Sequence, residues 1–212
     1  MTEAEWHASE SSVQMIWLTQ KSFPDRKGRL FASACLRRIA GLFPGPKTHN
    51  AIEVLERYAD GNATADELSQ ARADAEQEAY EVQDGGQRHQ SQDAAIAAAQ
   101  DDIQQVAHWA AEATATTEVG SEPEEVAQAA IVREIYGTLC FRPVTFNPAW
   151  RTSTVLALAK QMYDSRDFTP MPVLADALQD AGCENADILN HCRGDSPHVR
   201  GCWVVDLILG KE

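Results

Sequence analysis

Cysteine and histidine side chains gather near the C-terminus of this 212-residue chain. Cys183, Cys192, His198 and Cys202 follow the spacing C-x8-C-x5-H-x3-C, and thiolate and imidazole are ligands that Zn²⁺ prefers. His198 and Cys202 are four residues apart, so their side chains would share one face of a helix. The tight C-x2-C pair of zinc fingers and ribbons is missing from this spacing. The four residues are therefore candidate ligands of a structural zinc ion.

A packing role is the alternative, and it is the one that we expect. Cysteine is among the most buried residue types. The last predicted helix needs a broad apolar face, which Trp203 would anchor in the core. The three cysteines would pack near Trp203 as reduced thiols, with no metal and no other cofactor. On this interpretation His198 lies in a partly exposed first turn of the helix.

The sequence offers little support for catalysis. Cys192 and His191 lie at the predicted end of a helix, where the helix dipole disfavours a thiolate. The sequence holds no Walker motif, no H-E-x-x-H and no G-x-S-x-G. We therefore assign no catalytic or cofactor-binding residues. An enzyme that uses dispersed carboxylates ranks last among the alternative functions.

The elements that must position these residues are predicted to be helices. Caps, glycine stops and apolar residues at the helical period recur along most of the chain, whereas no alternating run is long enough for a sheet. We predict an all-α fold, a single domain of about eight or nine helices over residues 1–212. Its sub-regions would be N-terminal helices (1–60), an acidic, alanine-rich helical segment (61–140), and a strap followed by a C-terminal helical unit (141–212).

Individual helix ends are marked by cap residues. Thr64 and Glu67 form a capping box, and the predicted N-caps are Thr48, either Thr152 or Ser153, and Asn185. Gly182 is predicted to end the helix before Cys183, Gly194 the short helix that carries Cys192, and Gly210 the last helix. Asp195 or Ser196 would cap that last helix, which would then contain both His198 and Cys202.

The net charge of −14 is concentrated in one segment. Residues 61–134 carry 3 Lys/Arg against 16 Asp/Glu, whereas residues 1–60 carry 8 against 7 and residues 135–212 carry 7 against 9. Such an acidic segment repels nucleic acid, so we expect none to be bound. We expect a solvated face that could meet a protein partner with a basic surface. The basic predicted helix at residues 26–43 is an alternative, intramolecular landing site.

The chain shows no sign of membrane insertion or export. No apolar run approaches the roughly 18 residues that span a bilayer, and the N-terminus lacks the pattern of a signal peptide. Five cysteines, an odd number, suit a reducing compartment better than a disulfide framework. We therefore expect a cytoplasmic protein without a membrane partner.

Four stretches carry a resemblance to a known family. They are MTEAEW at residues 1–6, DRKGRLFASACLRRI at Asp25–Ile39, FRPVTFNPAW at Phe141–Trp150, and VLADALQDAGCENADILNHCRGDSPHVRGCWVVDLILGK at Val173–Lys211. In these stretches the chain resembles a paralogue-rich family of uncharacterised planctomycete bacterial proteins. The resemblance implies a bacterial source and brings no activity, cofactor or catalytic residue with it.

Taken with the missing catalytic motifs, the lopsided charge favours a non-catalytic protein–protein interaction or regulatory module of a bacterial cytoplasmic system. A helical protein that binds structural zinc through its C-terminal Cys/His cluster is the alternative.

Overall fold

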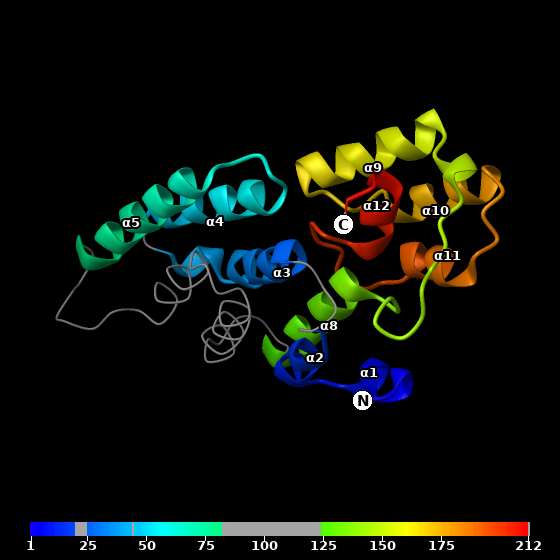
Figure 1. Cartoon of the computed structure of the whole chain (residues 1–212), viewed down its shortest axis with the longest axis horizontal. Coiled ribbons are helices and arrows are strands. Elements are labelled where there is room, and N and C mark those ends of the chain that lie inside the picture. The colour runs from blue at the N-terminus through cyan, green and yellow to red at the C-terminus, as the bar shows by residue number, and fades with distance from the viewer. Residues whose placement is uncertain (20–24, 44, 82–123, 212) are drawn as a thin grey trace. The chain divides into compact units, whose positions relative to one another are not determined.

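The computed structural model describes residues 1–19, 25–43, 45–81 and 124–211 (Figure 1). Within these ranges every regular element is helical, which confirms the predicted all-α class. The described residues contain ten α-helices, slightly more than predicted. Most of the acidic, alanine-rich segment predicted to be helical lies outside the described residues. Among the helices that are described, none combines the length and the apolarity needed to cross a membrane.

The chain divides into two compact units, residues 3–132 and residues 133–212. The first unit holds α1 (Glu3–Ala8), α2 (Ser12–Thr19), α3 (Asp25–Arg38), the 3-10 turn η1 (Ala40–Leu42), α4 (Pro46–Ala59), α5 (Ala65–Glu81) and most of α8 (Glu124–Tyr136). The second holds the end of α8, the 3-10 turn η2 (Pro148–Trp150), α9 (Ser153–Ser165), α10 (Met171–Asp180), α11 (Ala186–Arg193) and α12 (Trp203–Leu209).

In the first unit, α4 packs between α3 and α5 over an apolar core. The predicted capping box of α5 is confirmed: the Glu67 amide donates to Thr64 Oγ1, and the Thr64 amide donates to Glu67 Oε2. Thr48, however, is not the N-cap of its helix, because α4 already begins at Pro46. The capping acceptor comes instead from Glu78 on α5. Its carboxylate accepts the amide protons of Lys47 and Thr48 at 2.9 and 2.8 Å.

The basic side chains of α3 form ion pairs with carboxylates of the first unit. Three of its arginines meet carboxylates whose side chains are only 1–3% exposed: Arg26 pairs with Asp60, Arg37 with Glu56, and Arg38 with Glu124. Glu124 belongs to the acidic segment, so at least one pair of the predicted intramolecular kind is present. These basic side chains are therefore engaged within the chain.

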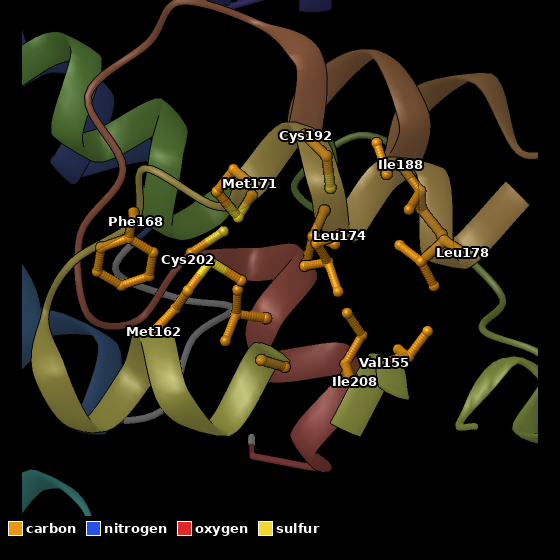
Figure 2. Packing of buried hydrophobic residues seen from close by; sticks show 14 of the residues in the cluster. Val155, Met162, Phe168, Met171, Leu174, Leu178, Ile188, Cys192, Cys202 and Ile208 are labelled. Atoms are coloured by element: carbon orange, nitrogen blue, oxygen red, sulfur yellow. The ribbon is translucent and has the colours of Figure 1, made fainter. Parts of the chain in front are cut away.

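In the second unit, α9, α10, α11 and α12 enclose an apolar core (Figure 2). The predicted cap at Asn185 is confirmed here, and of the two candidates for α9 the cap is Thr152. Thr152 Oγ1 accepts the Val155 amide, and Asn185 Oδ1 accepts the amides of Asp187 and Ile188. Gly182, with φ +85°, closes α10, because the following amide of Cys183 bonds back to the Leu178 carbonyl. The core is thus assembled from short helices with well-defined ends.

The last helix begins later than predicted. It starts at Trp203, and Cys202 is its N-cap. Before it, residues 197–198 are irregular, and residues 199–202 form a turn in which the Cys202 amide donates to the Val199 carbonyl at 3.0 Å. Gly201 adopts φ +92°, a conformation outside the helix that glycine tolerates best. His198 therefore lies in an irregular segment and Cys202 at the helix start, and the two do not share one helical face.

Candidate metal centre

Four side chains that can bind metal converge in the second unit. Glu134, His191, His198 and Cys202 each offer a ligand atom, and these four atoms lie within 4.8 Å of one another. Among the described residues this is the one group of its kind. The Glu134 and Cys202 residues are buried, and the His191 and His198 side chains are 14% and 7% exposed. The group is therefore largely closed to solvent.

Each ligand is positioned by the end of an element. Glu134 lies in the last turn of α8, and His191 lies in the last turn of α11, whose start is fixed by the Asn185 cap. His198 lies in the irregular segment before α12, and Cys202 is the N-cap of that helix. The main-chain carbonyl of Cys202 accepts the Asp206 amide at 2.8 Å, which ties the cysteine to α12.

The Glu134 carboxylate lies beside both imidazoles of the group. Its Oε1 lies 2.8 Å from His198 Nδ1, and its Oε2 lies 3.3 Å from His191 Nε2. Burial alone would raise the pKa of Glu134, but His191 and His198 outweigh it and hold the pKa below its usual value. The group therefore contains a buried anion at neutral pH.

Cys202 is a protonated thiol unless a cation stands beside it. Burial raises the pKa of Cys202 well above its usual value, and the charge and hydrogen bond of Glu134 raise it further. This environment is the opposite of the one that activates a nucleophilic cysteine. A metal ion, in contrast, deprotonates a thiol that coordinates it.

A chain of hydrogen bonds runs through His191. The Trp203 indole Nε1 donates to His191 Nδ1 at 3.1 Å, and His191 Nε2 lies 3.2 Å from Cys202 Sγ. Because indole nitrogen is only a donor, neutral His191 carries its proton on Nε2. The chain thus ends on the Cys202 thiol.

Two buried polar atoms of this group have no hydrogen-bond partner within the described part of the chain. They are Glu134 Oε2, which lies near His191 Nε2 without bonding geometry, and His198 Nε2. Buried polar atoms are normally paired, and each unpaired one costs about 1–3 kcal/mol. Both atoms belong to groups that can donate an electron pair to a metal.

The distances also suit a small tetrahedral ion. Bonds of 2.0–2.3 Å to zinc place neighbouring ligand atoms about 3.3–3.8 Å apart in a tetrahedron. His191 Nε2 already lies 3.2 Å from Cys202 Sγ and 3.3 Å from Glu134 Oε2. Small shifts would therefore complete such a site.

The structure brings together two of the four predicted ligands, His198 and Cys202. Cys183 and Cys192 are buried in the apolar core of the second unit and are not part of the group. Figure 2 shows Cys192 among the apolar side chains of this core. Burial, followed by the charge of Glu134, raises the pKa of Cys192 to about 12, which suits an inert packing residue. The predicted burial of Trp203 and of the three cysteines is confirmed.

His198 as a whole residue is partly exposed, as predicted, but it lies before α12 and not in the first turn of that helix. Its side chain alone is only 7% exposed, because it faces Glu134 and Phe168, whose ring centroid is 6.4 Å from that of the imidazole. Sequence reasoning did not propose Glu134 or His191 as ligands. The sequence does contain a hint of Glu134. It lies in the stretch IVREIY, between apolar residues on both sides, where a solvent-exposed carboxylate is not expected.

Comparison with protein-family models, with curated proteins and with solved structures finds no match to this chain. The resemblance to planctomycete proteins therefore stays a prediction, and any function must be argued from the site itself.

Proposed function

We propose that this protein is a helical module that binds one structural zinc ion through Glu134, His191, His198 and Cys202. The observation that carries the proposal is the approach of four ligand atoms to within 4.8 Å of one another in a largely buried place. Zinc is the metal that fits this mixture of sulfur, nitrogen and oxygen ligands best, since magnesium and calcium take oxygen ligands almost alone.

Charge balance supports the proposal. A divalent ion with one carboxylate, one thiolate and two neutral imidazoles has a net charge of zero. Burying an uncompensated charge is costly, and here the buried carboxylate has imidazoles and a thiol as its neighbours. Zinc would neutralise Glu134 and would stabilise the thiolate of Cys202.

A structural role is favoured over a catalytic one. Structural zinc sites are closed by four protein ligands, whereas catalytic sites keep one position for water. The four groups here would fill a tetrahedron, and they come from α8, α11 and the start of α12. The ion would therefore join three segments that are distant in sequence, and its binding energy would contribute to folding.

Metal analysis of the purified full-length chain tests the proposal. We expect one equivalent of zinc in the wild-type protein, and Co²⁺ in its place should give the visible bands of a tetrahedral site with thiolate charge transfer. Cys202→Ala and His198→Ala should lose the ion. Cys192→Ala is the matched control, because Cys192 is an equally buried cysteine outside the group. A wild-type protein that takes up no zinc, or a Cys202→Ala variant that keeps it, would show that the group is only a hydrogen-bonded network.

A separate proposal concerns partners. We infer that a cytoplasmic protein partner with a basic surface would meet the acidic helices, as the charge pattern predicts. Two observations favour this surface: α5 exposes Asp66, Glu67 and Glu81, and the arginines of α3 are engaged internally. The contact should weaken steeply with salt. Co-purification from the source cells at low and high salt tests it, and a partner that stays bound equally well at high salt would contradict it.

A further inference from the structure

We infer that Trp203 sets the metal affinity of the centre, because its indole holds His191 in the tautomer that cannot bind metal through Nε2. The inference rests on the proposed function and concerns the regulation of the same site. Trp203 is a positioning residue here, since it acts on the metal only through His191.

The tautomer follows from donor and acceptor chemistry. The indole N–H can only donate, and it lies 3.1 Å from His191 Nδ1, so Nδ1 must present its lone pair to it. A neutral imidazole with a lone pair on Nδ1 carries its proton on Nε2. Yet Nε2 is the atom that faces Cys202 Sγ at 3.2 Å and Glu134 Oε2 at 3.3 Å. The nitrogen that points into the centre is therefore protonated.

Metal binding through His191 requires the other tautomer. The Nε2 lone pair must be free for the metal, so one proton leaves Nε2 and one is taken up on Nδ1, and the imidazole stays neutral. Two N–H groups would then face each other across the contact with Trp203. Histidines that bind metal normally donate their second N–H to an acceptor, and the indole is not one. Zinc binding must therefore break the bond between Trp203 and His191.

The indole has little room to turn aside. Trp203 is 2% exposed, and its ring centroid lies 5.1 Å from that of His191. On another side it is seated against the main chain of Gly137. A Cβ atom added there would lie 2.6–2.7 Å from Cγ, Cδ1 and Nε1 of the indole. Because the ring is fixed in this way, the loss of its hydrogen bond opposes zinc binding, and the centre should exchange metal more readily than its four ligands suggest.

The first test replaces the indole with a ring that has no N–H. Trp203→Phe should bind zinc roughly 3- to 10-fold more tightly than the wild-type protein in a competition titration, which corresponds to one neutral hydrogen bond. Trp150→Phe is the control, because Trp150 belongs to the same unit, stacks edge-on with Phe146, and has no indole hydrogen bond to the four ligands among the described residues. Its zinc affinity should stay unchanged. A Trp203→Phe variant that folds and binds zinc with wild-type affinity would overturn the inference.

The second test needs no substitution of Trp203 and covers the case in which that variant fails to fold. Long-range ¹H–¹⁵N correlation spectra of the histidines, with His191→Gln for assignment, should place the His191 proton on Nε2 in the zinc-depleted protein and on Nδ1 after zinc is added. The indole N–H resonance of Trp203 should shift at the same step. A proton on Nδ1 before zinc is added would overturn the inference about Trp203 and leave the proposed zinc site untouched. A wild-type protein that binds no zinc would overturn the metal centre itself.

Discussion

The two units neutralise their buried carboxylates in different ways. In the first unit, Glu56 and Glu124 meet arginines, and Glu78 meets the N-terminus of α4. Guanidinium groups and main-chain amides keep their protons at any pH of interest, so these contacts are complete. In the second unit, Glu134 meets two imidazoles and a thiol, which can all bind a metal ion through a nitrogen or sulfur atom. The identity of the partner therefore separates a permanent contact from one that can respond to metal.

The largest expected effect compares two carboxylates on α8. Glu134→Gln removes a buried charge that is also a proposed zinc ligand, so it should abolish zinc binding. In the presence of zinc, its free energy of unfolding should be about 3–5 kcal/mol lower than that of the wild-type protein. Glu124→Gln removes an equally buried carboxylate that is paired with Arg38. Urea unfolding with zinc and with a chelator should show a zinc-dependent loss for Glu134→Gln only. A loss of the same size under both conditions would contradict the metal centre.

A somewhat smaller effect is expected at the seat of Trp203. Gly137→Ala should cost about 2–4 kcal/mol, because Gly137 has φ +55° and an added Cβ would overlap the indole. Gly210→Ala is its control, since Gly210 has φ +66° with nothing within 4 Å of an added Cβ. It should cost only about 1–2 kcal/mol for the backbone. Thermal unfolding measures the difference, and equal losses would show that the indole can yield.

In the first unit, the capping contact between Glu78 and the N-terminus of α4 can be tested in the same way. Glu78→Gln should cost about 1–2 kcal/mol, the value of a lost helix cap. Glu76→Gln is its control, because Glu76 lies in the same helix and, within the described ranges, its carboxylate pairs with Arg72 near the surface. Chemical unfolding at neutral pH measures both, and a loss at position 76 as large as that at position 78 would refute the capping role.

The same carboxylate predicts a dependence on pH. Burial alone would raise the pKa of Glu78, but hydrogen bonds from Lys47 and Thr48 outweigh it and hold the pKa below its usual value of 4.5. A lowered pKa in the folded state means that the unfolded chain binds the proton first. The stabilisation is therefore complete above the unfolded pKa and is lost as the pH falls through the folded one. The difference in stability between the wild-type protein and Glu78→Gln should shrink in this acidic range, whereas a constant difference would contradict the assignment.

The smallest effect is expected at the exposed ion pair of α9. Lys160 and Asp164 lie 2.8 Å apart with side chains 71% and 58% exposed. Lys160→Ala should change the free energy of unfolding by no more than about 0.5 kcal/mol, and less at high salt. Chemical unfolding at two salt concentrations measures this. A loss of more than about 1 kcal/mol in the free energy of unfolding would show that this ion pair stabilises the protein more than its exposure predicts.

Features that depend on neighbouring residues could be predicted from the sequence, whereas contacts between distant residues could not. The capping box of Thr64 and Glu67 and the cap at Asn185 need only residues within one turn of the helix. The cap of α4 comes from Glu78, 30 residues from Thr48, and no local pattern announces it. The candidate site divides in the same way. His198 and Cys202 were found through their ligand types, but Glu134 is 64 residues away from His198.

That separation has a consequence for the order in which the chain is made. The ribosome adds Glu134 at the end of α8 long before His198, 64 residues later. At about 5–20 residues per second, the carboxylate waits roughly 3–13 seconds for the groups that neutralise it. During this interval the last turn of α8 must keep Glu134 in water. The core of the second unit, which α12 helps to enclose, can therefore close only after His198 and the helix that follows it have been synthesised.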